Sequence, residues 1–161
     1  MTRAAVALAL LLSAASLTAE PLTRAEHAMI MTLADAQGVP RSIADRLQIE
    51  ESGDPRTGAW GDSEAQGPVG SDGARCLGLY QINPRWMADL VGRYYPHPAR
   101  YFDALNPIDS AVVALGYLAV LHRRFGTWER ALWFYNCGRV TDVPASTRSY
   151  ARRIVEWNKE D

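Results

Sequence analysis

The sequence lacks a strong charge of either sign. Its 161 residues carry 17 Lys and Arg against 18 Asp and Glu, which gives a formal net charge of -1 at pH 7. Proteins that bind nucleic acids usually carry a basic patch or an excess of positive charge. We therefore expect no nucleic acid partner.

The sequence also has no apolar run long enough to cross a membrane, which takes about 20 residues. Its most apolar stretch, Ala4–Leu12, follows Arg3 and gives way to small and hydroxyl residues. This pattern predicts a cleavable signal peptide over residues 1–19, cut after Ala19 or alternatively after Ala15. We expect a soluble protein without stable membrane insertion, in the periplasm or otherwise secreted.

Cysteine and histidine are scarce. Cys76 and Cys137 are the only cysteines, and an even pair in an exported chain predicts one disulfide. Closing that loop could stabilise the fold by about 4 kcal/mol, and the alternative is two separate thiols. His27, His97 and His122 have no ligand spacing, so we expect neither a metal site nor a cofactor.

The composition that remains is that of one globular domain. The chain is 48% hydrophobic and includes five Trp and seven Tyr. Its length suits one core, and no internal repeat or low-complexity tract divides it, so residues 20–161 are expected to form a single, monomeric domain. Core packing is the preferred interpretation for four tryptophans, Trp86, Trp128, Trp133 and Trp157.

Start and stop signals predict a mainly α fold with at most a small hairpin in the segment 54–77. A first helix is expected from the capping box at Thr23 to about residue 37, and a second from Pro40 to Gly53. Further helices are expected to begin at Asn83-Pro84, Asn106-Pro107, Thr127, and Ser146 or Thr147. The glycine-rich segment 54–75 is too long for an ordinary connection, which favours a lid or a binding surface.

Two adjacent carboxylates end the second predicted helix. Counting about 100° per residue from Ile43, the apolar face that Ala44 and Leu47 complete centres at about 50°. Glu51 then lies at about 80° and Glu50 at about -20°, so Glu51 is closer to the buried face. Burial raises the pKa of a carboxyl group and suits it to general acid catalysis. Two solvated charges at a helix end are the competing interpretation, and position alone does not decide between them.

Four short motifs follow one another along the chain. They are Glu51-Ser52-Gly53, Gly78-Leu79-Tyr80-Gln81-Ile82, Tyr135-Asn136-Cys137-Gly138 and Thr147-Arg148-Ser149-Tyr150. In order and spacing they resemble the soluble lytic transglycosylase (SLT) domain, a relative of goose-type lysozyme, with its Glu-Ser, Gly-Leu-Met-Gln-Ile, Tyr-Asn-x-Gly and Thr-x-x-Tyr motifs. One such motif is a weak signal, but four in order are a strong one.

The resemblance implies a lysozyme-like fold that cleaves the glycan strands of peptidoglycan. It implies Glu51 as the catalytic acid and base, with Ser52 positioning the sugar acetamido group. The other residues expected to bind the substrate or line the cleft are Tyr80, Gln81, Tyr135, Asn136 and Tyr150. Tyr80 stands where the family usually has Met. Both cysteines border the cleft in this fold, so a disulfide would tie its two walls together.

A family of this kind leaves the reaction product open. Lytic transglycosylases use one carboxylate and form a 1,6-anhydro product, whereas many glycoside hydrolases use two carboxylates. A second acid could come from the long loop, which carries Asp54, Asp62, Glu64 and Asp72. The expected activity is that of the lyase, with a hydrolytic lysozyme as the alternative.

An inactive peptidoglycan-binding assembly factor is a further alternative, but pure binding does not need an acid at residue 51. The weak charge, unlike that of many defensive lysozymes, favours a domestic role. The partner beside the glycan could be a secretion, pilus or flagellar assembly.

Overall fold

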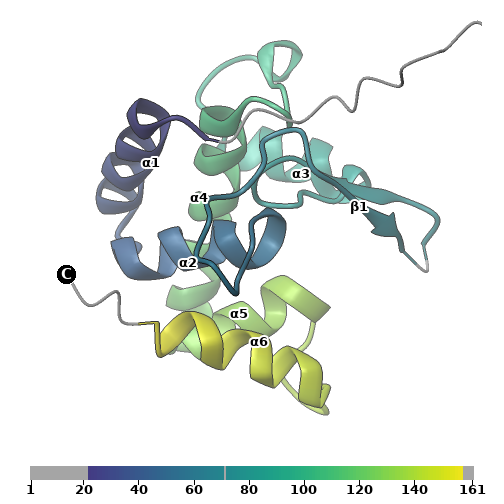
Figure 1. The fold of residues 1–161 in the computed structure, drawn as a ribbon. Coiled ribbons are helices and arrows are strands. Elements are labelled where there is room, and N and C mark those ends of the chain that lie inside the picture. Colours follow the sequence, from purple (N-terminus) through teal and green to yellow (C-terminus); the bar gives the residue numbers. More distant parts are fainter. Residues whose placement is uncertain (1–21, 71, 158–161) are drawn as a thin grey trace, which may run out of the picture.

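The computed structural model describes residues 22–70 and 72–157, and the predicted signal peptide lies outside this part (Figure 1). Its helices are α1 (Arg24–Gln37), α2 (Arg41–Ser52), α3 (Pro84–Tyr94), the 3-10 helix η1 (Ala99–Tyr101), α4 (Pro107–Phe125), α5 (Trp128–Cys137) and α6 (Ala145–Val155). The predicted mainly α, lysozyme-like fold class with one small hairpin is confirmed. Within the described part, no helix has the length and apolar character needed to span a membrane.

Four helices, α1, α3, α4 and α5, begin where a side chain satisfies their first backbone N–H groups. Thr23 and Glu26 form the predicted capping box, in which the Glu26 carboxylate accepts from the Thr23 N–H at 2.8 Å. Asn83 and Asn106 cap α3 and α4 through their side-chain oxygens. Only α6 starts earlier than predicted, at Ala145, one residue before the first expected position. Local sequence therefore sets most helix boundaries.

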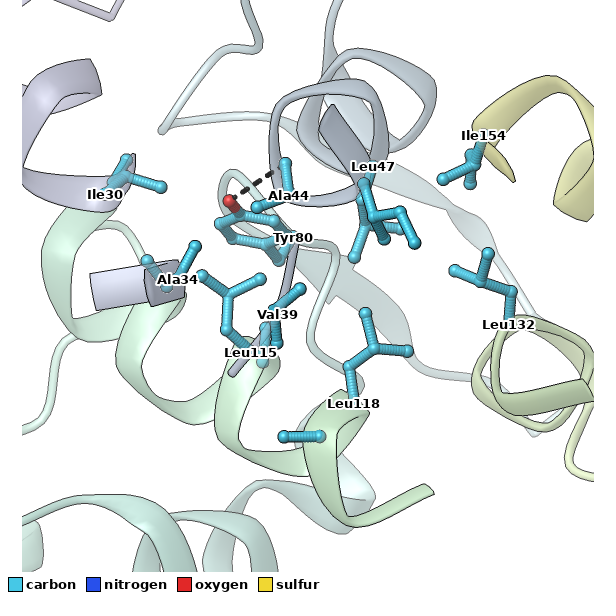
Figure 2. Packing of buried hydrophobic residues seen from close by; sticks show 14 of the residues in the cluster. Ile30, Ala34, Val39, Ala44, Leu47, Tyr80, Leu115, Leu118, Leu132 and Ile154 are labelled. Atoms are coloured by element: carbon cyan, nitrogen blue, oxygen red, sulfur yellow. Dashed lines mark hydrogen bonds between the residues drawn. The ribbon is translucent and has the colours of Figure 1, made fainter. Parts of the chain in front are cut away.

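Helix α4 runs through the middle of the molecule, with α1 and α2 on one side and α5 and α6 below (Figure 1). Leu115 and Leu118 of α4 are fully buried at its centre. Around them gather fully buried side chains from the other helices, namely Ile30, Leu47, Leu132 and Ile154 (Figure 2). The main core cluster thus joins the first and last described helices, and a smaller cluster holds Ile82, Val91 and Val113.

Trp86 corrects the prediction that all four tryptophans pack in the core. Trp128 and Trp133 do pack against the core, but Trp86 is 65% exposed on α3. Val91 is the buried residue of that helix. Five residues separate the two positions, so Trp86 points about 140° away from Val91 around the helix, toward solvent.

The long loop after α2 is ordered by contacts with the helices. It contains β1 (Gln66–Val69), which pairs antiparallel with β2 (Arg75–Leu77). The Trp60 ring stacks on His27 of α1 with ring centroids 4.2 Å apart. The Gly61 N–H donates to the side-chain oxygen of the fully buried Gln48. The loop is therefore docked rather than loose, as the residues of a binding surface must be.

The turn after β2 gives a stability prediction at Gly78. This buried glycine has φ +75°, and an added Cβ would overlap the carbonyl oxygen of Ala104. Gly78→Ala should destabilise the fold by about 3 kcal/mol, because backbone strain and overpacking add. Gly38 is the matched control, with φ +73° and no atom near an added Cβ. Urea unfolding of both alanine variants checks this, and equal losses would contradict it.

Candidate active site

The Glu51 carboxyl group lies half-buried in the last turn of α2. It accepts a hydrogen bond from the phenol of Tyr150, on α6. Burial raises the pKa of Glu51 to about 7; the Tyr150 hydrogen bond opposes this shift, and the Glu50 charge adds to it. Within the described residues, no cationic side chain pairs with Glu51. Near neutral pH this carboxyl group can therefore both donate and accept a proton.

Glu50, its neighbour, is ion-paired with two arginines. Its carboxylate binds Arg46 at 2.6 Å and Arg153 of α6 at 2.8 Å, and the Glu50 side chain is only 2% exposed. The Arg46 guanidinium also stacks over the ring of Trp157 at 4.1 Å. The angle around the helix had placed Glu50 farther than Glu51 from the buried face. The Glu50 side chain is nevertheless covered, because Arg153, which comes much later in the sequence, pairs with it. Glu50 is thus an ion-paired link between α2 and α6.

The contrast between the two glutamates can be tested through Tyr150. Its hydrogen bond stabilises the charged form of Glu51, so Tyr150→Phe should raise the pKa of Glu51 above about 7. Titration of the Glu51 side chain by carbon-13 NMR measures this. Tyr101→Phe is the control, because the Tyr101 hydroxyl contacts Arg100. An unchanged or lowered pKa in Tyr150→Phe would refute the assignment.

Ser52 ties α2 to the second motif. Its hydroxyl donates to the Leu79 carbonyl at 2.8 Å, and its carbonyl accepts from the Asp62 N–H at 3.3 Å. A side chain at Gly61 would overlap the Ser52 hydroxyl oxygen, so the glycine allows the loop to approach this closely. The donor capacity of Ser52 is therefore used within the protein, and its oxygen can still accept from an acetamido N–H.

Tyr135 and Asn136 end α5 beside this centre. The Tyr135 hydroxyl donates to the Tyr80 carbonyl at 2.8 Å. Burial raises the pKa of Tyr135 most, and the charge of Glu51 raises it further. The side-chain oxygen of Asn136 accepts from the Thr147 hydroxyl at 2.7 Å. This link between two of the motifs was not predicted from the sequence, although Thr147 is part of the fourth.

Gln81 sits at the base of the hairpin in a left-handed conformation, with φ +49°. Its side-chain N–H groups donate to the carbonyls of Gly78 at 2.9 Å and Ala65 at 3.3 Å. Residues held in sparsely populated backbone regions often lie at functional sites. Here the Gln81 side chain braces the turn that carries the second motif.

Tyr80 corrects the prediction that its side chain lines the cleft. It is fully buried in the core, and its hydroxyl donates to the Ala44 carbonyl at 3.3 Å (Figure 2). Because that carbonyl satisfies the polar end of the ring, the phenol can replace an apolar side chain in the interior. Of the predicted site residues, Tyr80 reaches the centre only through its carbonyl, which binds Tyr135.

Cys76 and Cys137 are free thiols in the structure, so the predicted disulfide is not confirmed. Burial raises the pKa of the Cys76 thiol, and the charges of Glu51 and Asp72 raise it further. The Cys137 thiol points toward the Arg139 carbonyl at 3.7 Å. In the described part of the chain, no three His, Cys, Asp or Glu residues cluster to hold a metal ion.

The loop acids are held by local contacts. Asp54 accepts from the Arg56 N–H at 2.9 Å, and Asp62 from the Glu64 N–H at 2.8 Å. Asp72 accepts from the Asn83 amide at 2.9 Å, and this bond is the main cause that lowers its pKa. The nearby charge that acts on the pKa of Glu51 is that of Glu50.

Comparison with known proteins gives one match. The family model described as Transglycosylase SLT domain matches residues 29–158. No curated protein and no solved structure matches the chain. The matched segment covers most of the chain and contains every motif that surrounds Glu51.

Proposed function

The chain belongs to the transglycosylase SLT domain family, with a peptidoglycan-directed function of the lytic transglycosylase type, and we propose that it cleaves the β-1,4 bond between N-acetylmuramic acid and N-acetylglucosamine. In this proposal the product carries a 1,6-anhydro end, and Glu51 is the general acid and base. Ser52, Gln81, Tyr135, Asn136 and Tyr150 would contact or position the glycan.

The observation that carries the proposal is the unequal state of the two adjacent glutamates. Glu50 is ion-paired with Arg46 and Arg153. Glu51 accepts from a phenol instead, and its pKa of about 7 keeps both protonation states accessible near neutral pH. A group that donates a proton and then takes one back needs such a pKa.

The mechanism then uses this one carboxyl group twice. Protonated Glu51 gives its proton to the glycosidic oxygen as the bond to C1 of the muramic acid breaks. The resulting carboxylate takes the proton of the C6 hydroxyl of the same sugar, and that oxygen forms the new bond to C1. Glu51 regains its proton, no water is consumed, and the leaving chain carries a free hydroxyl.

The charges around Glu51 support the lyase over a hydrolase. A hydrolase with two carboxylates needs its second acid at a separation of roughly 5–9.5 Å across the sugar. Among the described residues, the carboxylate whose charge acts on the pKa of Glu51 is the ion-paired Glu50, not a loop acid (Asp54, Asp62, Glu64 or Asp72). The proposed site of action is outside the cytoplasm, in line with the predicted signal peptide.

Mass spectrometry of digested peptidoglycan tests the product. We expect the native protein to release fragments that end in 1,6-anhydro-N-acetylmuramic acid. Fragments with reducing ends would replace the lyase with a hydrolase. If the protein released no soluble fragments, neither enzymatic activity would stand.

A further inference from the structure

Three tyrosine rings form a row that leads away from Glu51 across α5, α4 and α3. The ring centroid of Tyr135 lies 6.0 Å from that of Tyr117, which lies 6.0 Å from that of Tyr94. All three side chains are partly exposed. We call Tyr135, Tyr117 and Tyr94 the tyrosine row. The row begins at the candidate active site, because the Tyr135 hydroxyl donates to the Tyr80 carbonyl, next to the Leu79 carbonyl that Ser52 binds.

A glycine allows the far end of the row to form. Gly116 precedes Tyr117 on α4, and a Cβ added there would lie 3.4 Å from the Cβ and Cδ1 atoms of Tyr94. That distance is ordinary van der Waals contact, so an alanine would just touch Tyr94, whereas a longer side chain would compete with its ring for space. The missing side chain thus lets Tyr94 settle on α4 beside Tyr117.

The hydroxyl groups differ along the row. The Tyr135 hydroxyl is held by the Tyr80 carbonyl, but those of Tyr117 and Tyr94 have no partner among the described residues. Neither of these two oxygens is among the buried polar atoms left without a partner, so both reach solvent. A tyrosine with a partly covered ring and a solvated hydroxyl can meet a ligand that has both apolar and polar faces.

Charged groups border the same rings. Burial is the main cause that raises the pKa of Tyr117; beyond Tyr94, the charges of Arg124 and Asp89 also act on it, so both lie near the row. Asp89 pairs with Arg93 on the exposed side of α3, at 2.8 Å. Carboxylate and guanidinium groups beside aromatic rings can bond the hydroxyl and acetamido groups of a sugar.

We propose that the tyrosine row is an extended subsite that binds further β-1,4-linked amino sugars of the glycan strand on one side of Glu51. The inference rests on the proposed function for its substrate class. The apolar faces of successive pyranose rings pack on the tyrosine rings, whose spacing is of the order of one sugar unit. A longer strand therefore makes contacts at Tyr117 and Tyr94 that a short one cannot make.

Binding of N-acetylglucosamine oligomers to the full protein tests the row, measured calorimetrically in the Glu51→Gln background so that no cleavage occurs. Tyr94→Ala should lower the affinity for the hexamer by about five- to tenfold and leave that for the trimer unchanged. Tyr94→Phe keeps the stacking face and should retain most of the affinity. Tyr101→Ala is the control, since Tyr101 is an exposed aromatic residue outside the row, 60% accessible.

Three results would overturn the row as a subsite. They are an equal loss for trimer and hexamer, no loss for either, and no hexamer binding before substitution of Tyr94. Thermal unfolding of each variant separates lost binding from lost folding. The two proposals can fail separately. Fragments with reducing ends would overturn the lyase, but a loss of affinity for the hexamer alone would still support the tyrosine row.

Discussion

Glu51→Gln should abolish glycan cleavage and at the same time stabilise the fold above pH 7. The amide cannot give or take a proton, so we expect the rate of fragment release to fall by roughly a thousandfold or more. The amide oxygen can still accept the hydrogen bond from Tyr150, so the geometry of the site should persist. Release of soluble fragments from peptidoglycan over time measures the loss.

The gain in stability follows from the raised pKa of Glu51. Between pH 4.5 and about 7 the unfolded chain has lost this proton while the folded chain keeps it, so the native protein loses stability as the pH rises. Above pH 7 the cost reaches about 3 kcal/mol, and Glu51→Gln removes it. Urea unfolding at pH 4 and pH 8 should therefore give a variant that is more stable than the native protein only at pH 8.

The rate of fragment release and the stability at pH 8 together separate lost catalysis from lost folding. An inactive variant that is also more stable cannot owe its inactivity to unfolding. Cleavage by Glu51→Gln at the native rate would remove Glu51 from the mechanism. Equal stability of the two proteins at pH 8 would mean that Glu51 has an ordinary pKa.

Glu50→Gln should produce the opposite pattern, with the stability lost. The substitution leaves Arg46, 5% exposed, without its carboxylate partner and breaks the link to Arg153. Removing one partner of a buried ion pair costs about 3 kcal/mol or more, because an uncompensated charge stays buried. Urea unfolding at pH 7 measures the loss, and the protein that remains folded should still cleave glycan.

A surface pair on α3 is the matched control for Glu50. Asp89 and Arg93 are spaced four residues apart, like Arg46 and Glu50, but both side chains are more than half exposed. Asp89→Asn should cost less than about 0.5 kcal/mol. Similar losses in the two variants would refute the structural role of Glu50. Full stability together with lost cleavage in Glu50→Gln would exchange the roles assigned to the two glutamates.

The helices could be predicted because their signals are local. The capping box at Thr23 and the caps at Asn83 and Asn106 act within three residues, and all three helices begin where those residues stand. The match of the family model over residues 29–158 confirms the resemblance that the four motifs carried. Helix caps and short sequence motifs can both be recognised without knowing which residues pack against the helix or loop that carries them.

Burial could be predicted less well because it depends on distant partners. Tyr80 was expected near the substrate and Trp86 in the core, but the structure buries Tyr80 in the core and leaves Trp86 exposed. The Ala44 carbonyl that satisfies the Tyr80 hydroxyl lies 36 residues away in the chain. The angles around the predicted helix likewise gave Glu50 and Glu51 different positions. In the structure, what distinguishes their environments is Arg153, which pairs with Glu50 and lies 103 residues later in the sequence.

The hydrogen bond between Tyr150 and Glu51 joins residues 99 positions apart, one on α6 and one on α2. Helix α6, which supplies Tyr150, also supplies Arg153 and part of the burial around the acid. A chain in which α6 has not yet docked therefore carries a solvated glutamate with an ordinary pKa, ionised at neutral pH. The raised pKa that general acid catalysis needs therefore exists only once α6 is docked on α2.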